Sequence, residues 1–149
     1  RDLFDDLGLC QFLHATRGRG FHVGAPLDAS ADFDTVRALA SDAAECLAGA
    51  DPDQLTTAQR KDKRGHRVFL DTNRNGYGQT FVAPYSLRSR PGATVATPLD
   101  WSELGNAAPN GWNPTKLRQR LAQKPDPWRD IYRHATAAEK ARQKLNTLR

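Results

Sequence analysis

Side chains that could bind phosphate gather in the stretch TRGRGFH, from Thr16 to His22, which lies between two apolar runs. Glycine accepts the positive φ that a tight turn requires, and the backbone N–H groups of such a turn can point at an anion. Together with the hydroxyl of Thr16, the arginines Arg17 and Arg19 and the imidazole of His22, they could form a phosphate cradle. The alternative is the solvated tip of a β-hairpin.

A second polar stretch, DTNRNGYG from Asp71 to Gly78, has Asp, Asn, Asn and Gly at the first, third, fifth and sixth places of an EF-hand loop. The twelfth place should be a bidentate Glu but is Val82, and the flanks look like strands rather than helices. A calcium-binding structural domain is therefore disfavoured. The other interpretation makes Asp71 a carboxylate at the end of a buried strand, although a lone Asp there is more often a turn-former.

The two stretches together offer the groups that phosphoryl or nucleotidyl transfer needs. Asp71 could hold a divalent metal, while Arg74 and Arg88 could bind a polyphosphate and His22 could donate to it. Paired metals normally need more than one carboxylate, and the sequence shows no obvious second. The pattern therefore favours a phosphate-handling site without completing it.

Hydrophobic spacing and turn residues predict the elements that position these groups. We expect a helix over 1–8 ended by Gly8, strands over 10–16 and 21–27 around the charged turn, and a helix over 33–49 capped by Asp32. The inner face of that last helix is predicted to carry Phe33, Val36, Leu39, Ala40, Ala43, Cys46 and Leu47.

Shorter elements follow along the second half of the chain. The pattern predicts a short helix over 55–63, strands over 68–72 and 79–88 joined as a hairpin, a short helix over 100–104, a basic helix over 115–124 and a polar C-terminal helix in which nothing packs obviously. This order indicates an α+β fold, with a mixed, largely antiparallel sheet and helices on one face.

The balance of charge favours an anionic partner. The net charge is +5 and the isoelectric point is about 9.6, and no apolar segment is long enough to favour a membrane. Candidate DNA contacts lie in the basic run 60–67, at Lys61, Lys63, Arg64 and Arg67, although a solvated surface would look the same. Cys10 and Cys46 are interpreted as reduced core thiols of a cytoplasmic, nucleoid-associated protein.

Several blocks in order resemble one family over residues 1 to about 131. They are DLGL, T-x-G-x-G-x-H, DFDTVRALA, LTTAQRKDKRGHRVFLDTNRNGYGQT, VAPYSLRSRPGATVATPLDW and DPWRDI. The chain resembles the polymerase domain of bacterial ATP-dependent DNA ligase D, of the archaeo-eukaryotic primase superfamily, or a stand-alone relative. The resemblance implies a partial primase-polymerase domain over 1–133, the greater part of its RNA-recognition-motif-like half, and leaves 134–149 as a basic helical tail.

The resemblance also implies roles for single residues. Asp71 matches the third metal-binding, catalytic aspartate, while the matches to nucleotide-binding positions are Thr16 (usually serine), Arg19 (usually basic), His22, Arg74 and Arg88. The first two metal ligands of the family form a D-x-D pair on an upstream strand that this sequence does not contain. Asp5 and Asp6 are adjacent on a predicted helix, so they cannot replace two carboxylates on one face of a strand.

The activity implied by the resemblance is template-directed nucleotidyl transfer to a DNA 3′-hydroxyl in end-joining repair. Its cofactors would be two Mn²⁺ or Mg²⁺ ions and its substrates NTP or dNTP, with ribonucleotides and manganese preferred. Its partners would be DNA ends or primer–template, a ligase and end-binding repair proteins. We expect these residues alone to be inactive, and the alternative is a non-catalytic nucleic-acid-binding module that uses the basic run and the helix at 114–124.

Overall fold

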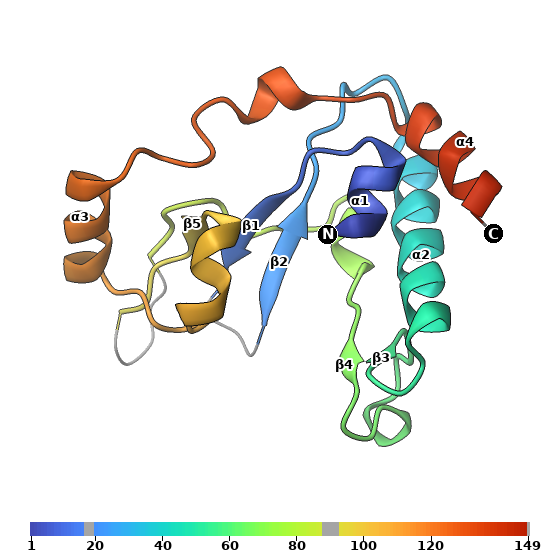
Figure 1. Cartoon of the computed structure of the whole chain (residues 1–149), viewed down its shortest axis with the longest axis horizontal. Coiled ribbons are helices and arrows are strands. Elements are labelled where there is room, and N and C mark those ends of the chain that lie inside the picture. Colours follow the sequence, from blue (N-terminus) through green and yellow to red (C-terminus); the bar gives the residue numbers. More distant parts are fainter. Residues whose placement is uncertain (17–19, 88–92, 149) are drawn as a thin grey trace. The chain divides into compact units, whose positions relative to one another are not determined.

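The structure, a computed structural model, describes residues 1–16, 20–87 and 93–148, and it confirms the α+β class (Figure 1). The chain folds into two compact units. The helical unit comprises Arg1–Leu9, Leu27–Thr80 and Thr136–Arg149, and the sheet unit comprises Cys10–Pro26 and Phe81–Ala135. Among the described residues, no helix is both long enough and apolar enough to cross a membrane.

Three helices build the helical unit. Helix α1 (Asp2–Leu7) ends at Gly8, whose φ of 72° is the left-handed conformation that favours glycine. Helix α2 (Phe33–Ala50) begins at Asp32, whose carboxylate accepts a 2.7 Å hydrogen bond from the N–H of Thr35. Both helix boundaries agree with the sequence prediction. Helix α4 (Ala138–Leu148) contacts α1 and α2.

The packing of α4 corrects one expectation. Ala138, Ala141 and Leu145 recur at helical spacing and are buried, so α4 closes the core of the helical unit. The prediction that nothing in this helix packs was wrong because two of its three core residues are small alanines, which look neutral in a polar sequence. The predicted boundary of a separate tail at residue 134 stays a prediction.

Burial also corrects the predicted inner face of α2. Leu39 is buried as expected, but Phe33 at the first turn has 55% of its surface exposed. Cys46 is half-buried, and Cys10 is exposed, so Cys10 is not the core thiol that the sequence predicted. Cys10 lies before the first strand, so the strand does not turn its side chain towards the core.

The segment 55–63 is not the predicted helix. Leu55–Thr56 forms strand β3, which pairs in parallel with β4 (Val68–Phe69), and only Lys61–Lys63 forms a 3-10 turn. Long-range hydrogen bonds override the local pattern, because the N–H of Val68 donates to the Gln54 carbonyl at 2.7 Å. Val68 is exposed, so β4 is also not the buried strand that was expected before Asp71.

The hairpin predicted between 68–72 and 79–88 does not form. After β4 the chain makes a 3-10 turn, Asn73–Asn75, and residues 79–87 form no strand. The end of that segment instead pairs with the chain near β5 (Thr97–Leu99), through a Leu87–Val95 bridge and a 2.8 Å hydrogen bond from the Tyr85 N–H to the Ala96 carbonyl.

The sheet unit is built on three antiparallel strands in the order β2-β1-β5. The predicted hairpin is confirmed: β1 (Phe12–Ala15) pairs with β2 (Phe21–Gly24) in a register that sets His14 opposite His22. On one face, Leu13 and Ala15 pack with Leu99 in a core that Phe21, Trp101, Leu104, Ala107 and Trp112 border. The other face carries Phe12 and His14.

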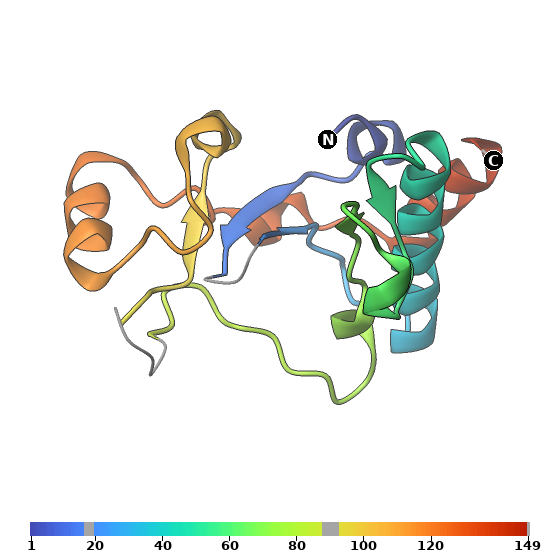
Figure 2. The ribbon, with the colours of Figure 1, turned by 90° about the horizontal axis from the view of Figure 1, so that it is seen from below.

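Two helical segments flank β5 in the sheet unit (Figure 2). They are the 3-10 helix Trp101–Asn106 and α3 (Pro114–Gln123), close to the predicted 100–104 and 115–124. Glu103 forms a capping box with Asp100 at the start of the 3-10 helix. Its carboxylate also forms a 2.6 Å ion pair with Arg120, whose side chain is almost fully buried. A further short 3-10 helix, Ile131–His134, ends the unit.

Candidate functional site

The charged turn begins on the sheet unit at Thr16. This residue directly follows β1, is 9% exposed, and its hydroxyl donates a long, 3.5 Å hydrogen bond to the Gly20 carbonyl. The hydroxyl therefore faces the turn that it precedes, at the position predicted from the sequence. Arg17 and Arg19 lie outside the described residues, so their predicted phosphate contacts stay predictions.

His22 lies on β2, on the same sheet face as His14, and is half-buried. The two imidazole ring centroids are 6.2 Å apart, and the Phe81 ring lies 5.0 Å from His22 and 5.9 Å from His14. The strand register and an aromatic neighbour thus hold the His22 ring in place. A histidine held in this way can present a ring N–H to an anion without first losing side-chain freedom.

His14 is a feature that the sequence analysis missed. It is 0% exposed, and its pKa is lowered to about 4, first because burial disfavours the imidazolium and second because of the charge of His22. The Ala96 backbone opposes this shift, although neither ring nitrogen makes a hydrogen bond of ordinary geometry. His14 is therefore neutral at pH 7. The alternation of side chains along the strand FLHA could have predicted this position, because it puts His14 on the sheet face opposite to the one that carries Leu13.

Trp128 covers His14 on this face. Its ring centroid lies 5.0 Å from His14 and 5.9 Å from Phe12, and its indole N–H donates to the Leu13 carbonyl at 3.2 Å. A tryptophan that is tied to the β1 backbone and packs on two β1 side chains makes this face rigid. The block DPWRDI thereby contributes to the histidine face as well as to the family resemblance.

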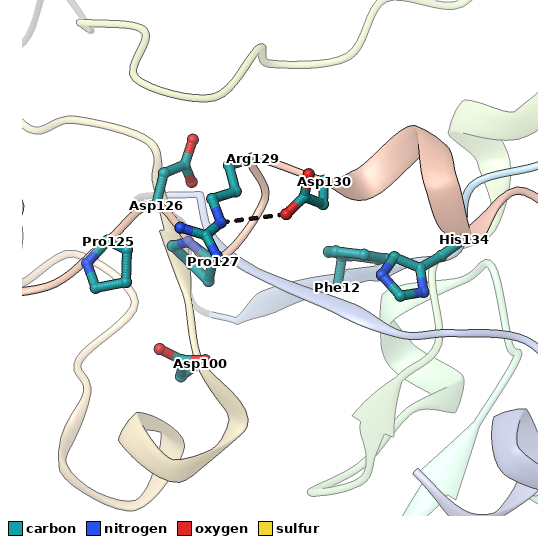
Figure 3. A pocket seen from close by; sticks show the side chains of 8 residues that line it. All are labelled: Phe12, Asp100, Pro125, Asp126, Pro127, Arg129, Asp130 and His134. Carbon is teal, nitrogen blue, oxygen red and sulfur yellow. Dashed lines mark hydrogen bonds and ion pairs between the residues drawn. The ribbon is translucent and has the colours of Figure 1, made fainter.

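A cavity of about 260 Å³ lies beyond Phe12 (Figure 3). Its lining includes three carboxylates, but Arg129 points at Asp130 and forms a 3.2 Å ion pair with it. The residues that line it are Phe12, Asp100, Pro125, Asp126, Pro127, Arg129, Asp130 and His134. None of the predicted site residues is among them, so this cavity does not coincide with the predicted phosphate site.

Asp71 lies on the helical unit, two residues after β4. It is exposed, and its Oδ1 accepts a 3.1 Å hydrogen bond from the Asn73 N–H. This is the turn-forming role considered for a lone Asp, and it leaves the second carboxylate oxygen open to other partners. Arg74 is exposed and donates to the Gln79 side chain at 3.1 Å, while Arg88 lies outside the described residues.

The basic run 60–67 divides into structural and exposed cations. Arg64 donates to the Ala58 and Gln59 carbonyls, and its guanidinium lies 3.6 Å from the centre of the Phe69 ring. Arg67 donates to the Lys63 and Arg64 carbonyls. The arginines thus hold the loop together, whereas Lys61 and Lys63 are exposed.

The described residues do not assemble a metal site by themselves. They contain no group of three or more His, Cys, Asp or Glu side chains placed to hold one ion. Mg²⁺ and Mn²⁺ prefer several oxygen ligands, and Asp71 offers one carboxylate. The donor set around Asp71 is therefore insufficient for a divalent ion on its own.

The predicted site residues fall into two groups. Thr16 and His22 lie together on the sheet unit, at the two ends of the charged turn. Asp71, Arg74 and the basic run lie on the helical unit, where the Asn73 side chain donates to the Gln59 side chain at 3.1 Å and ties the Asp71 turn to the basic run. The predicted hairpin positions Thr16 and His22 on the sheet unit, whereas on the helical unit the strand before Asp71 is not buried and the hairpin expected after it does not form.

Comparison with known proteins identifies what the chain is similar to. Residues 1–128 match the family described as LigD, primase-polymerase domain. The non-homologous end joining DNA repair protein LigD of Mycobacterium tuberculosis H37Rv is 35% identical over 126 residues, and LigD of Pseudomonas aeruginosa PAO1 is 35% identical over 131. These matches cover 85% and 86% of this chain but only 17% and 16% of the two relatives.

A solved structure agrees with the sequence matches. The polymerase domain of Mycobacterium tuberculosis ligase D, in complex with DNA, superposes with a TM-score of 0.81 at 33% identity. The match covers 91% of this chain and 47% of that one, so the chain spans about half of the solved domain. Sequence and fold lead to the same conclusion: the chain belongs to the LigD primase-polymerase domain family.

Proposed function

We propose that this chain is part of a template-directed nucleotidyltransferase that adds ribonucleotides or deoxyribonucleotides to DNA 3′ ends in end-joining repair. The observation that carries the proposal is the family match over residues 1–128, which contains every predicted site residue. The similar solved structure, a polymerase domain in complex with DNA, supports a DNA substrate. The proposed partners are DNA ends or primer–template, nucleoside triphosphates, a ligase and end-binding repair proteins.

The nucleotide-binding role rests on the charged turn. His22 is held by its strand and by Phe81, and the neutral His14 opposite it adds no repulsive charge. A protonated His22 would donate to a phosphate oxygen, and Thr16 would add a hydroxyl donor. Arg19, Arg74 and Arg88 are proposed to neutralise further phosphate charge. Charge-assisted contacts of this kind suit a triphosphate better than an uncharged ligand.

Asp71 is proposed to contribute one carboxylate to a Mn²⁺ or Mg²⁺ site of the enzyme. The described residues contain no group of three or more His, Cys, Asp or Glu side chains that could hold an ion, so further protein ligands are proposed to come from other parts of the complete protein. We therefore propose that residues 1–149 alone bind nucleotide weakly and do not extend a primer.

The substitution Asp71→Asn tests the proposal in the complete protein that contains this chain. Asparagine keeps the Oδ1 acceptor that the Asn73 N–H uses, so the turn should survive while the metal ligand is weakened. Primer extension on a DNA 3′ end should fall well below a tenth of the wild-type rate, a loss of more than about 1.4 kcal/mol in the transition state.

Asp53→Asn is the matched control, because Asp53 is an exposed aspartate in another turn of the same unit. It should extend the primer at the wild-type rate. Retention of a tenth or more of the activity by Asp71→Asn, with folding intact, would remove Asp71 from the metal site.

A non-catalytic nucleic-acid-binding module remains the second candidate. The observation that favours it is the single candidate carboxylate, together with the exposed Lys61 and Lys63 on the basic run. The two functions differ in one measurement. A complete protein that binds DNA ends but adds no nucleotide, with Mn²⁺ or Mg²⁺ supplied, would favour the module.

A further inference from the structure

Two aromatic rings of the helical unit are exposed to solvent and touch each other. Tyr77 has 84% of its surface exposed and Phe33 has 55%. Their ring centroids are 5.5 Å apart with an interplanar angle of 77°, an edge-to-face contact. Such large apolar rings are normally buried, so an exposed pair in contact marks a candidate interaction surface.

The pair is held by well-defined backbone. Phe33 is the first residue of α2, and Tyr77 follows the 3-10 turn Asn73–Asn75, which packs on α2. The Asn75 side chain closes that turn with a 2.9 Å hydrogen bond to the Thr72 carbonyl. Little conformational freedom would therefore be lost when a flat ligand lies against the rings.

The charges around the pair distinguish between a base and a phosphate as its ligand. Asp32 and Asp34 flank Phe33, so the aromatic pair itself does not attract phosphate. Two cations belong to neighbouring segments: Arg37 is one helical turn along α2 and lies near Gly76, and Arg74 belongs to the 3-10 turn that precedes Tyr77. An uncharged base on the rings, with its backbone on neighbouring cations, fits this pattern.

The basic run lies on the same unit and is tied to this turn. The 3.1 Å hydrogen bond between the side chains of Asn73 and Gln59 joins the 3-10 turn that precedes Tyr77 to the residue just before the basic run with Lys61 and Lys63. A single DNA strand whose phosphates lie along the exposed lysines could thus place an unpaired base on the aromatic pair. Aromatic platforms beside basic grooves are how proteins bind single-stranded DNA without sequence preference.

We propose that Phe33 and Tyr77 form a stacking platform for an unpaired base of a single-stranded DNA overhang. The proposal rests on the proposed function, since it names the part of the DNA substrate that this unit contacts. Two other occupants could cover the same rings: another segment of a longer protein, or a second copy of the chain. Each of them gives a different result in the test.

The test uses the complete protein and two DNA duplexes, one blunt and one with a short single-stranded 3′ overhang. Tyr77→Ala should weaken binding of the overhang duplex about five-fold to a hundred-fold, the usual value of one stacked base, and leave blunt-end binding unchanged. Tyr77→Phe keeps the ring and should retain the affinity. A 2-aminopurine base in the overhang should lose its fluorescence quenching in Tyr77→Ala.

Tyr132→Ala is the matched control, because Tyr132 is 87% exposed, also beside arginines, but belongs to the sheet unit. It should leave overhang affinity unchanged. An equal loss on blunt DNA, or no loss in Tyr77→Ala, overturns the proposal. A lower melting temperature with unchanged overhang affinity would indicate a covering protein segment, and a change in oligomeric state a second copy; either result also overturns it.

The outcome is separable from that of the proposed function. Overhang binding that depends on Tyr77, in a wild-type protein that cannot extend a primer, would support the platform and refute the polymerase. Normal primer extension with overhang binding independent of Tyr77 would refute the platform alone.

Discussion

Two segments of the chain have the same sequence pattern but different structures. Residues 12–24 and 68–87 each contain an apolar run, a polar turn with glycines and a second apolar run. The first forms the antiparallel hairpin of β1 and β2, whereas the second forms a two-residue strand and a 3-10 turn without a returning strand. The pattern therefore predicts where extended chain occurs more reliably than it predicts which segments pair.

The difference arises from the available hydrogen-bond partners. In the first segment β1 pairs on one edge with β2, the next strand along the chain, and on its other edge with β5. In the second, β4 pairs with β3, which precedes it by twelve residues, and the N–H of Tyr85 goes to Ala96. Every buried backbone group needs a partner, so an alternative partner elsewhere in the chain can replace a local hairpin.

The two segments also hold their candidate phosphate-binding side chains differently. His22 is held by a four-residue register, by His14 and by Phe81. Arg74 lies on a short exposed turn and donates a hydrogen bond to the Gln79 side chain. A contact from a rigid, partly buried residue loses less entropy on binding than one from an exposed arginine. The charged turn should thus contribute more to nucleotide affinity.

The largest expected effect tests this ranking. In the complete protein, His22→Ala should lower nucleotide affinity about ten-fold to a hundred-fold, since it removes a phosphate contact where solvent is partly excluded. Arg74→Ala should lower it less, by about three-fold to ten-fold, because an exposed ion pair is screened. Nucleotide titrations of the two variants measure the difference, and binding to a blunt duplex should change little in His22→Ala. Reversal of this order would make the second turn the main phosphate site.

The next effect concerns pH and the buried His14. Its folded pKa of about 4 lies below the ordinary value of 6.5, so the unfolded chain binds more protons between these values. The contribution of neutral His14 to the free energy of unfolding should therefore be complete above pH 6.5 and should decrease as the pH falls towards 4. At pH 5 the loss in the free energy of unfolding should be about 2 kcal/mol, since about one and a half pH units below 6.5 have then been crossed at ~1.4 kcal/mol per unit.

His14→Phe provides the comparison for that measurement, since it keeps an aromatic ring and removes the titrating group. Urea unfolding at pH 7 and pH 5 should show a smaller decline in the variant than in the wild type. An identical decline in both proteins would mean that the acid sensitivity arises elsewhere. An acid-stable wild type would contradict the burial argument itself.

The smallest effect separates the two kinds of cation in the basic run. Replacing both Lys61 and Lys63 with alanine should reduce the salt dependence of DNA binding by about two phosphate contacts, with little effect on stability. Arg64→Ala should instead destabilise the loop, because its guanidinium holds two carbonyls and packs on Phe69. Affinity measured across salt concentrations, alongside melting temperature, distinguishes the two. An unchanged salt slope in the double variant would place the DNA contacts outside this run.

Features that depend on residues close together in the chain could be predicted from the amino-acid sequence. The end of α1 at Gly8, the start of α2 at Asp32 and the charged hairpin turn before His22 follow from caps and turns whose partners lie within a few residues. The setting of Thr16 and His22 could therefore be predicted, and so could the family. The roles of these residues in binding nucleotide stay predictions.

Other features depend on contacts that form only when the chain has folded. The parallel pairing of β3 with β4, the packing of α4 through its alanines and the neutral state of His14 were not visible in the sequence. Each depends on what a segment meets after folding: the strand that accepts its N–H groups, the helix that covers a small side chain, or the rings that exclude water from an imidazole. These partners lie outside the few residues that a local pattern covers, so the pattern carries no information about them.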